Sequence, residues 1–241
     1  MAQSKVRVFV DQPLGEAQTV AVSADQAHYL FGVMRLSVGD VITVFNGTDG
    51  AWAAEIVDAA KRRGMLLCKE QTAPQHMPPD LWLLFAPIKK ARTDFIVEKA
   101  AELGAARICP VQTRFTNSER IRQDRLQAHA IEAAEQCGGT FVPHVSALEK
   151  LDTVLAKWPE DRQLVFCDES LVGTASSLAA VRQGPAAILI GPEGGFSPEE
   201  RTRLRAAPFA TSISLGPRIL RADTAAVAAL TLWQTTVGDW A

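Results

Sequence analysis

The first 70 residues alternate between short apolar runs and turn-forming residues. A single stretch with helical spacing, Ala24–Leu36, follows Ser23, a residue type that favours helix N-caps. Several short strands with one helix predict a small β-barrel or compact β domain. The strand-like runs are Val6–Val10, Thr19–Val22, Val41–Phe45, Ala51–Val57 and Met65–Lys69.

From Leu81 onward, strand-like runs alternate with helical patterns. The apolar run Leu81–Ala86 is typical of a strand that is buried on both faces. This alternation predicts an α/β domain with a mostly parallel sheet. Further strands are expected at Arg107–Val111, Leu164–Cys167, Ala186–Ile190 and Thr211–Leu215, and helices at Ala91–Leu103, Ser118–Cys137, Ala147–Trp158, Thr174–Arg182, after Ser197, and at Ala225–Val237.

Three prolines, Pro74, Pro78 and Pro79, mark a linker between these two regions. We therefore expect a β domain over residues 1–72, a linker over 73–80 and an α/β domain over 81–241. The length of 241 residues, with 47% hydrophobic residues, suits one small and one medium domain. We find no run of roughly 20 apolar residues that would span a bilayer and no secretory leader, so we expect a cytoplasmic protein.

A glycine-rich loop follows the expected strand Ala186–Ile190. Its segment Gly191–Gly195 contains three glycines, which let backbone groups approach a ligand closely. The loop continues into Ser197-Pro198-Glu199-Glu200, a capping box with proline at the first helical position. It lacks the GxGxxG pattern and the Walker lysine, and Glu193 would repel a phosphate. A cationic or hydroxyl-bearing ligand therefore fits this loop better than a phosphate.

A second unusual loop, Leu215–Arg221, follows the last expected strand. Arg218 and Arg221 flank two apolar residues just before a helix, for which Asp223 or Thr224 is the expected cap. Apolar side chains suit a flat ring, and arginines suit an anion. Because ligands bind at the carboxyl ends of strands in such sheets, we expect the two loops to form one site.

Basic residues form only local groups in a chain whose net charge is −2. This charge disfavours non-specific coating of nucleic acid, which typically needs a strongly basic protein. Lys89, Lys90 and Arg92 follow a strand at the same expected sheet edge as the two loops, and they are candidates for contacts with RNA phosphates. The spacing of the histidines and cysteines matches no metal site, so no metal is expected.

Together these residues resemble a known family. Leu189–Gly195 and Leu215–Ala225 are similar to the signature of the SPOUT methyltransferases, and most similar to that of the bacterial 16S rRNA (uracil-N3)-methyltransferases. Gly139 stands where this family often has arginine, and Asp223 stands where it usually has glutamate. The resemblance extends to three further segments: His28–Leu36, Lys89–Gly104 and Glu135–Pro143.

The resemblance implies properties that composition and spacing do not show. It implies a SPOUT-type α/β domain with a C-terminal trefoil knot, preceded by a PUA-like β-barrel that binds RNA, with Arg7 and Arg35 as candidate contacts. It also implies S-adenosylmethionine as cofactor and a homodimer formed through the knotted domain. The implied partner is 16S rRNA of the small ribosomal subunit, and the implied reaction is methylation of one uridine at N3 during ribosome biogenesis.

For such a reaction, the chemistry of the two loops suggests a division of roles. Arg221, with Arg218 as second candidate, is expected to stabilise the uracil anion that forms when N3 loses its proton. Either Glu193 or Asp223 is expected to accept that proton. The residues expected to hold the cofactor are Leu189, Gly191, Gly194, Gly195, Leu215, Gly216, Ile219 and Leu220.

Three alternatives remain open from the sequence. The chain could be a SPOUT methyltransferase that acts on another RNA such as tRNA, a non-catalytic RNA-binding module, or an ordinary doubly wound nucleotide-binding enzyme. The intact Gly191–Gly195 loop counts against the second alternative. The missing GxGxxG and Walker patterns count against the third.

Overall fold

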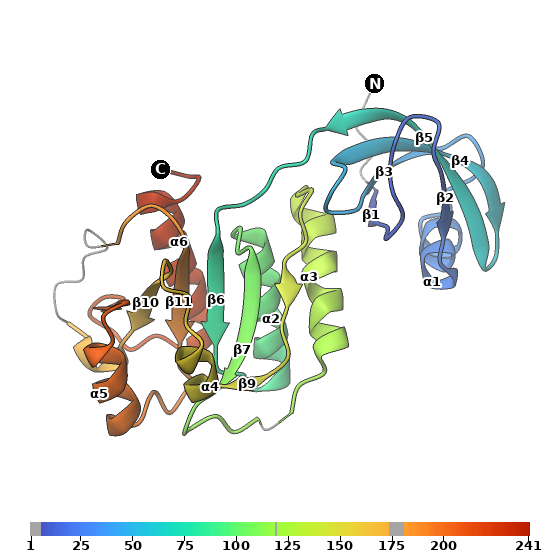
Figure 1. The fold of residues 1–241 in the computed structure, drawn as a ribbon. Coiled ribbons are helices and arrows are strands. Elements are labelled where there is room, and N and C mark those ends of the chain that lie inside the picture. Colours follow the sequence, from blue (N-terminus) through green and yellow to red (C-terminus); the bar gives the residue numbers. More distant parts are fainter. Residues whose placement is uncertain (1–5, 119, 174–180) are drawn as a thin grey trace. The chain divides into compact units, whose positions relative to one another are not determined.

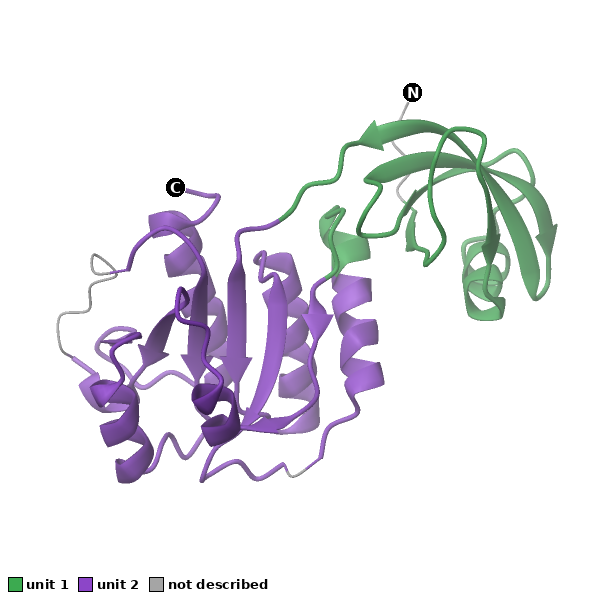
Figure 2. Ribbon diagram, in the orientation of Figure 1, with its two compact units in different colours: residues 1–77, 134–142 green, residues 78–133, 143–241 purple. Residues whose placement is uncertain are grey.

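The computed structural model describes residues 6–118, 120–173 and 181–241. The chain divides into two compact units (Figure 2): unit 1 comprises residues 1–77 and 134–142, and unit 2 comprises residues 78–133 and 143–241. Residues 134–142 are the end of a helix and the loop that follows it. The continuous boundaries expected from the sequence do not include this return of the chain to unit 1. No described helix is long and apolar enough to cross a membrane.

Unit 1 contains a five-stranded sheet, as far as its residues are described, in the order β1-β3-β4-β5-β2. β1 lies parallel to β3, and the other neighbouring strands are antiparallel. Its core includes Val20, Leu30, Ile42, Ile56 and Leu66, all fully buried. The elements are β1 (Arg7–Phe9), β2 (Thr19–Val22), α1 (Ala24–Ala27), the π-helix η1 (His28–Val33), β3 (Val41–Phe45), β4 (Ala51–Ala60) and β5 (Arg63–Ala73).

The helix expected over Ala24–Leu36 ends earlier than predicted and changes its geometry. It begins as α1, which has a capping box at its start, and continues as the π-helix η1. Arg35 then adopts a left-handed backbone with a φ of 56°. The Leu36 amide donates to the Leu30 carbonyl at 2.9 Å, so the chain after the left-handed residue folds back onto the last turn of η1. The left-handed residue therefore stops the helix at Val33.

Unit 2 is built on a parallel sheet with the strand order β12-β10-β11-β6-β7-β8, with β9 paired to β7 (Figure 1). Every described pair in it is parallel, which confirms the predicted α/β class. The elements are β6 (Leu81–Phe85), α2 (Lys90–Glu102), β7 (Arg107–Gln112), α3 (Gln123–Cys137, whose end belongs to unit 1), β8 (His144–Val145), β9 (Glu149–Lys150), α4 (Leu151–Ala156), β10 (Gln163–Cys167), the 3₁₀-helix η2 (Glu169–Leu171), β11 (Ala186–Ile190), α5 (Pro198–Ala206), β12 (Ala210–Ile213) and α6 (Ala222–Val237).

Several expected helices of unit 2 differ from those in the structure. The helix expected from Ser118 begins only at Gln123, as α3. Residues 174–180 of the helix expected at Thr174–Arg182 lie outside the described residues, and the last two residues of that range are not helical. The helix expected at Ala147–Trp158 is shortened to α4, because residues 149–150 pair with the end of β7 as the short strand β9.

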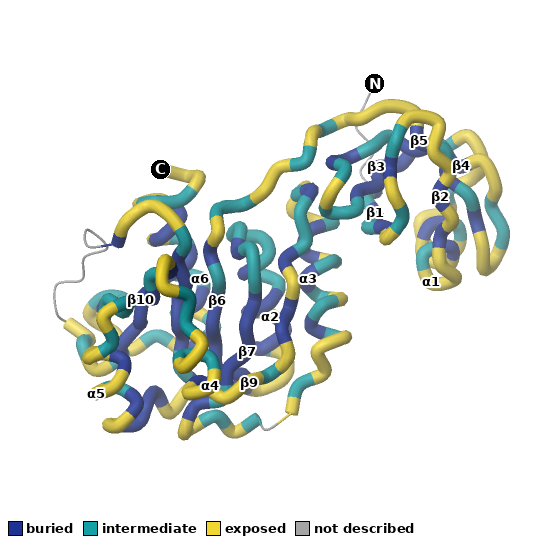
Figure 3. The backbone as a smooth tube through the Cα atoms, viewed as in Figure 1, coloured by how far each residue is buried: buried dark blue, intermediate teal, exposed yellow. Residues whose placement is uncertain are grey.

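The central strands of unit 2 are buried on both faces (Figure 3). Every residue of β11 is buried, and in β6 only Trp82 is partly exposed. Beyond the edge strand β12 the chain returns to the middle of the sheet, where α6 packs against α2 and β11. This return brings the loop after β12 beside the loop after β11.

A buried arginine ties the amino ends of three strands together. The Nη1 atom of Arg162 donates to the carbonyl oxygens of Asp80 and Ala186, each at 3.0 Å, and its Nη2 atom donates to the Asp80 carboxylate at 2.6 Å. The guanidinium also lies 3.7 Å from the centre of the Trp82 ring. Because Arg162 is only 6% exposed and Ala186 is fully buried, loss of the arginine would remove a donor from a buried carbonyl and leave the Asp80 carboxylate without its ion pair.

We therefore expect Arg162→Met to lower the free energy of unfolding by about 2–4 kcal/mol, measured by urea denaturation. The matched control is Arg203→Met, which removes a half-exposed ion pair with Asp152 and should cost at most about 1 kcal/mol. Equal effects of the two substitutions would show that Arg162 has no special part in holding the strands.

Candidate functional site

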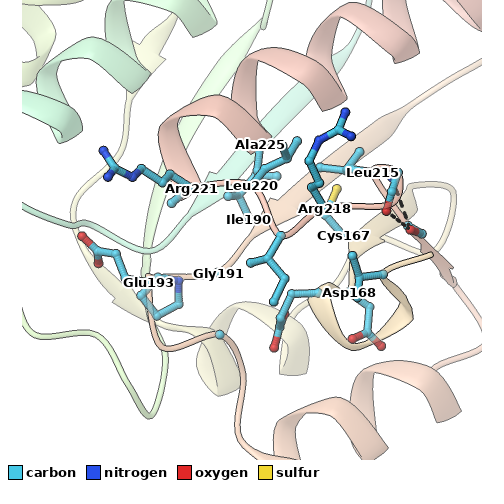
Figure 4. A pocket seen from close by; sticks show the side chains of 18 residues that line it. Cys167, Asp168, Ile190, Gly191, Glu193, Leu215, Arg218, Leu220, Arg221 and Ala225 are labelled. Atoms are coloured by element: carbon cyan, nitrogen blue, oxygen red, sulfur yellow. Dashed lines mark hydrogen bonds between the residues drawn. The ribbon is translucent and has the colours of Figure 1, made fainter. Parts of the chain in front are cut away.

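Three neighbouring strands of unit 2 end at one edge of the sheet, and the loops after them line a cavity, here called the three-loop cavity (Figure 4). Since parallel strands place their carboxyl ends together, the loops after β10, β11 and β12 meet there. The lining residues are Cys167, Asp168, Glu169 and Val172 at and after the end of β10; Ile190, Gly191, Pro192, Glu193 and Gly195 at and after the end of β11; Ser214, Leu215, Gly216, Arg218, Ile219, Leu220 and Arg221 after β12; and Ala222 and Ala225 at the start of α6.

Most residues expected to hold a cofactor line this cavity: Gly191, Gly195, Leu215, Gly216, Ile219 and Leu220. Leu189 instead lies fully buried in the core of unit 2. Gly194 faces Phe115, and a Cβ atom at this position would lie 3.2 Å from the Cβ of Phe115. Ile219 is the most exposed apolar side chain of the cavity, at 73% of its surface. An apolar group in that position is available to a ligand.

Packing within the loop also explains its glycines. A Cβ atom on Gly191 would lie 2.6 Å from the ring of Phe196, which is fully buried with its edge toward Phe166. Gly195 has a φ of 67°, and a Cβ atom there would overlap with Oε1 of Glu169. Gly191 and Gly195 are therefore required by the close packing of protein side chains, whether or not a ligand also approaches them.

Glu169 fixes the glycine loop from the neighbouring strand end. Its Oε1 atom accepts a hydrogen bond from the Phe196 amide at 3.2 Å and another from Arg201 at 2.8 Å. The preceding residue, Asp168, is buried and accepts from Nε of Arg205 at 2.8 Å and from the Ser170 hydroxyl at 2.8 Å. Both carboxylates are thus held by protein groups.

Sequence reasoning missed these two acids. A signal was available, because the acid pair directly follows the expected strand Leu164–Cys167 and so belongs to the same carboxyl edge as the other two loops. The expected capping box at Ser197 is confirmed: the Glu200 amide donates to the Ser197 hydroxyl, and the Ser197 amide donates to the Glu200 carboxylate.

The loop after β12 differs from its prediction at both ends. β12 ends at Ile213, and α6 begins at Ala222, earlier than the expected start at Ala225. The N-cap residue is Arg221, with no hydrogen bond from its side chain, so the expected cap at Asp223 or Thr224 is wrong. The early start of the helix places both of these residues in its first turn.

Asp223 forms an ion pair with a residue on another helix. Nη1 of Arg92 lies 3.2 Å and 3.4 Å from the two carboxylate oxygens of Asp223, whose side chain is 17% exposed. Asp223 is not among the residues that line the cavity, whereas Glu193 and Arg221 are. In Figure 4 the side chains of Glu193 and Arg221 lie on one side of the cavity, and that of Arg218 lies on the other. The geometry therefore separates the two candidate proton acceptors.

The candidate RNA-binding residues of unit 1 have different environments. Nη2 of Arg7 donates to the Gly139 carbonyl at 2.8 Å, and its guanidinium lies 5.1 Å from the centre of the Phe45 ring. Burial lowers the pKa of Arg7. Arg7 thus holds the returning segment 134–142 in place, at the position where the resembled family often has an arginine. Arg35, in contrast, is exposed at the end of η1.

The basic residues at the start of α2 also differ among themselves. Lys89 is the N-cap residue of α2, and both Lys89 and Lys90 are exposed. Arg92 is partly buried in its ion pair with Asp223. Only the two lysines therefore present their charges freely to a partner.

Among its described lining residues, the three-loop cavity offers charged side chains, and no reactive nucleophile, for chemistry. Cys167 lines it, but burial raises the pKa of this thiol, which stays neutral at pH 7 and is a poor nucleophile. Across the described residues, no group of three or more His, Cys, Asp or Glu side chains is placed to hold a metal ion. An arginine and a carboxylate on one side of an apolar cleft can stabilise an anion and accept a proton.

Family comparisons agree with this chemistry. Residues 75–234 match the model of an RNA methyltransferase domain, and residues 22–64 match that of an RNA methyltransferase PUA domain. The chain belongs to the RNA methyltransferase family. The predicted family and the PUA-like N-terminal domain are thereby confirmed.

Individual relatives extend over nearly the whole chain. The "Ribosomal RNA small subunit methyltransferase E" of Rickettsia conorii is 32% identical over 93% of this chain and 93% of its own length, and that of Bacillus subtilis is 28% identical over 93% and 94%. The solved structure of the same enzyme from Neisseria gonorrhoeae, bound to S-adenosyl methionine, superposes with a TM-score of 0.88 at 29% identity, covering 98% of this chain and 99% of that one. A putative methyltransferase from Legionella pneumophila, in complex with bound SAM, gives a TM-score of 0.87 at 28% identity, covering 97% and 98%.

The position of Gly195 generates a prediction about ligand binding. Gly195→Ala places a methyl group against the Glu169 carboxylate in a left-handed backbone, so the loop must move. We expect the affinity for S-adenosylmethionine, measured by calorimetry, to fall at least about tenfold, the equivalent of 1.4 kcal/mol.

The matched control is Gly138→Ala, because Gly138 also has a positive φ of 79° but has no atom within 4 Å of the added Cβ. It strains the backbone without disturbing the loop, and cofactor affinity should stay unchanged. A Gly195→Ala protein that binds the cofactor as well as the control would contradict the assigned role of the loop.

Proposed function

We propose that this protein transfers the methyl group of S-adenosylmethionine to N3 of one specific uridine in 16S rRNA. The observation that carries the proposal is the placement of Arg221 and Glu193 on one side of the three-loop cavity, in a chain of the RNA methyltransferase family. The length over which the chain matches small-subunit rRNA methyltransferases supports the choice of substrate.

The lining of the three-loop cavity suits the chemistry of the cofactor. Gly191, Gly195 and Gly216 expose backbone groups at its wall, and Leu215, Ile219 and Leu220 provide apolar contact for the adenine ring. When bound, S-adenosylmethionine supplies a methyl group activated by a positively charged sulfur. The protein is left with the tasks of positioning and of managing charge on the uracil.

Arg221 and Glu193 would prepare the uracil for reaction. N3 of uracil carries a proton at neutral pH and becomes a good nucleophile when that proton leaves. Glu193 accepts the proton, and Arg221 stabilises the negative charge that spreads to O2 and O4 of the ring. We assign the proton to Glu193 because Asp223 is held by Arg92 and does not line the cavity. Arg218 is the second candidate for anion stabilisation.

The RNA would contact both units. N3 lies on the Watson–Crick edge, so the uridine must be unpaired or extruded to enter the cavity. In unit 1, the exposed Arg35 follows a helical segment that carries the exposed side chains of Tyr29, Val33 and Met34, a combination suited to phosphate and base contacts. In unit 2 we assign RNA contacts to Lys89 and Lys90. Arg7 and Arg92 are instead assigned to packing and to the ion pair described above.

The fold-level expectations of the family complete the proposal. The return of the chain from β12 to α6 is compatible with a C-terminal trefoil knot. Phe95 on α2 and Leu232 on α6 are exposed apolar side chains on two helices that pack together, which suits a homodimer formed through the knotted domain. Methylation would take place in the cytoplasm, on the small ribosomal subunit or its precursor.

The decisive experiment is mass spectrometry of 16S rRNA from a strain that lacks the gene. We expect one N3-methyluridine to disappear and to return when the wild-type gene is restored. Unchanged 16S rRNA together with a lost modification in tRNA would replace the proposed substrate with tRNA.

Arg221→Ala should lower the rate of methyl transfer by about 10²–10³-fold, since it removes the charge that faces the uracil anion. Binding of S-adenosylmethionine should change only a few-fold by calorimetry. Full activity of the variant in a methyl-transfer assay with 16S rRNA would remove Arg221 from the mechanism.

The choice between the two carboxylates is also testable. Glu193→Gln should lower kcat by roughly 10²–10⁴-fold, the usual contribution of a general base. Asp223→Asn should have a much smaller effect on kcat and should mainly lower the melting temperature, because it weakens the pair with Arg92. The reverse order of effects on kcat would make Asp223 the proton acceptor.

A further inference from the structure

A second cavity, of about 370 Å³, lies at the carboxyl edge of the sheet in unit 2. It is lined by the turn after β6, the first turn of α2 and the segment that leads into α3. Since β6 pairs in parallel with β11, the two cavities adjoin the ends of neighbouring strands. Neighbouring strands are about 5 Å apart, so the second cavity begins one strand away from the three-loop cavity.

Positive charge dominates the lining of this second cavity. Lys90, Arg120, Arg122 and Arg125 contribute cations, and Asp94 is the acidic lining residue. Arg125 is paired with Asp94, and Arg122 is paired with the exposed Asp124 at 2.6 Å. Within the described part of the chain, Lys90 and Arg120 form no ion pair. The described lining residues therefore carry a net positive charge, which suits an anion.

Buried polar contacts fix the walls of the second cavity. Asp94 is only 7% exposed and binds the guanidinium of Arg125, which sets the orientation of that arginine. The Thr93 hydroxyl accepts from the Ile88 amide at 3.0 Å and donates to the Ile88 carbonyl at 3.1 Å. These bonds hold the turn that carries Lys90. The cavity is thus preformed.

One segment of chain connects the two cavities. Phe115 packs against Gly194 of the glycine loop, and the Arg114 amide donates to the Glu200 carboxylate at 2.8 Å. A few residues later the same segment supplies Arg120 to the second cavity. If a uracil enters the three-loop cavity, the RNA strand on one side of it would run along this segment. A neighbouring phosphate would then come close to the second cavity.

We infer that this basic cavity binds a phosphodiester group of the substrate RNA, next to the uridine that is methylated. The inference rests on the proposed function and adds the site that anchors the RNA backbone. Arginine and lysine groups bind phosphate through charge-assisted hydrogen bonds, and such contacts set the register of the chain without reading its sequence. A phosphate bound in this cavity would limit the positions that the adjacent base can take, and so would help to place the uridine in the three-loop cavity.

The test uses the double variant Lys90→Ala/Arg120→Ala in the full-length protein. Binding of a 16S rRNA fragment that contains the target uridine should weaken by about 10–100-fold. The slope of log K against log salt should become shallower by about 0.7 for each lost phosphate contact. The loss should appear in the KM for RNA far more than in kcat, and calorimetry should give the wild-type affinity for S-adenosylmethionine.

The matched control is Lys157→Ala/Arg182→Ala, which removes the same charge from exposed positions before β10 and before β11, at the opposite edge of the sheet. It should leave both RNA affinity and salt slope unchanged. Melting temperatures of both double variants near the wild-type value establish that they are folded.

Two results would overturn the inference. One is equal RNA affinity and salt slope in the two double variants. The other is tight binding of inorganic phosphate or uridine monophosphate to the wild type but not to Lys90→Ala/Arg120→Ala, with unchanged RNA binding, which would assign the cavity to a free anion. Either result leaves methylation by the wild type intact, whereas a wild-type protein that does not methylate 16S rRNA would contradict the proposed function itself.

Discussion

The burial of a parallel sheet on both faces is the constraint on which the rest of unit 2 depends. Strands such as β6 and β11 consist almost entirely of apolar residues, because helices and loops exclude water from both sides. Polar chemistry is thereby confined to the edges of the sheet. At the amino edge, Arg162 donates hydrogen bonds to the residues at the starts of β6 and β11. The carboxyl edge carries both cavities.

At that carboxyl edge, the glycine loop is held from several sides at once. Phe196 packs against Gly191, Phe115 packs against Gly194, and the Glu169 carboxylate occupies the position where a side chain on Gly195 would lie. A loop of this kind keeps its backbone in place before any ligand arrives, so binding costs little conformational entropy. The rigid backbone also explains how so few side chains can define a cofactor site.

The sequence predicts most elements of unit 2, because its strands are continuous apolar runs and α5 has a clear cap at Ser197. It also predicts the two glycine-containing loops and half of the residues that line the three-loop cavity. It misses Asp168 and Glu169, whose partners Arg205 and Arg201 lie on a helix that begins 30 residues later. Contacts between segments so far apart leave no periodic signal.

Other differences have equally specific causes. The sequence does not predict the π-helical turn of η1, because the left-handed conformation of Arg35 is unusual for a residue with a Cβ atom. It leaves open the choice between Glu193 and Asp223, because the pair of Asp223 with Arg92 joins residues more than 100 positions apart. Tertiary contacts, and not local preference, decide these points.

The return of residues 134–142 to unit 1 has a consequence for the history of the chain. The core of unit 1 includes Phe45 and Ala51 packed with Ala134 and Val142, so a fragment that ends at residue 77 lacks part of its own interior. A single recombination event at the proline-rich junction would therefore transfer an incomplete β unit. We therefore expect the two units to have evolved together within one gene, and unit 1 not to have been exchanged between genes as an independent domain.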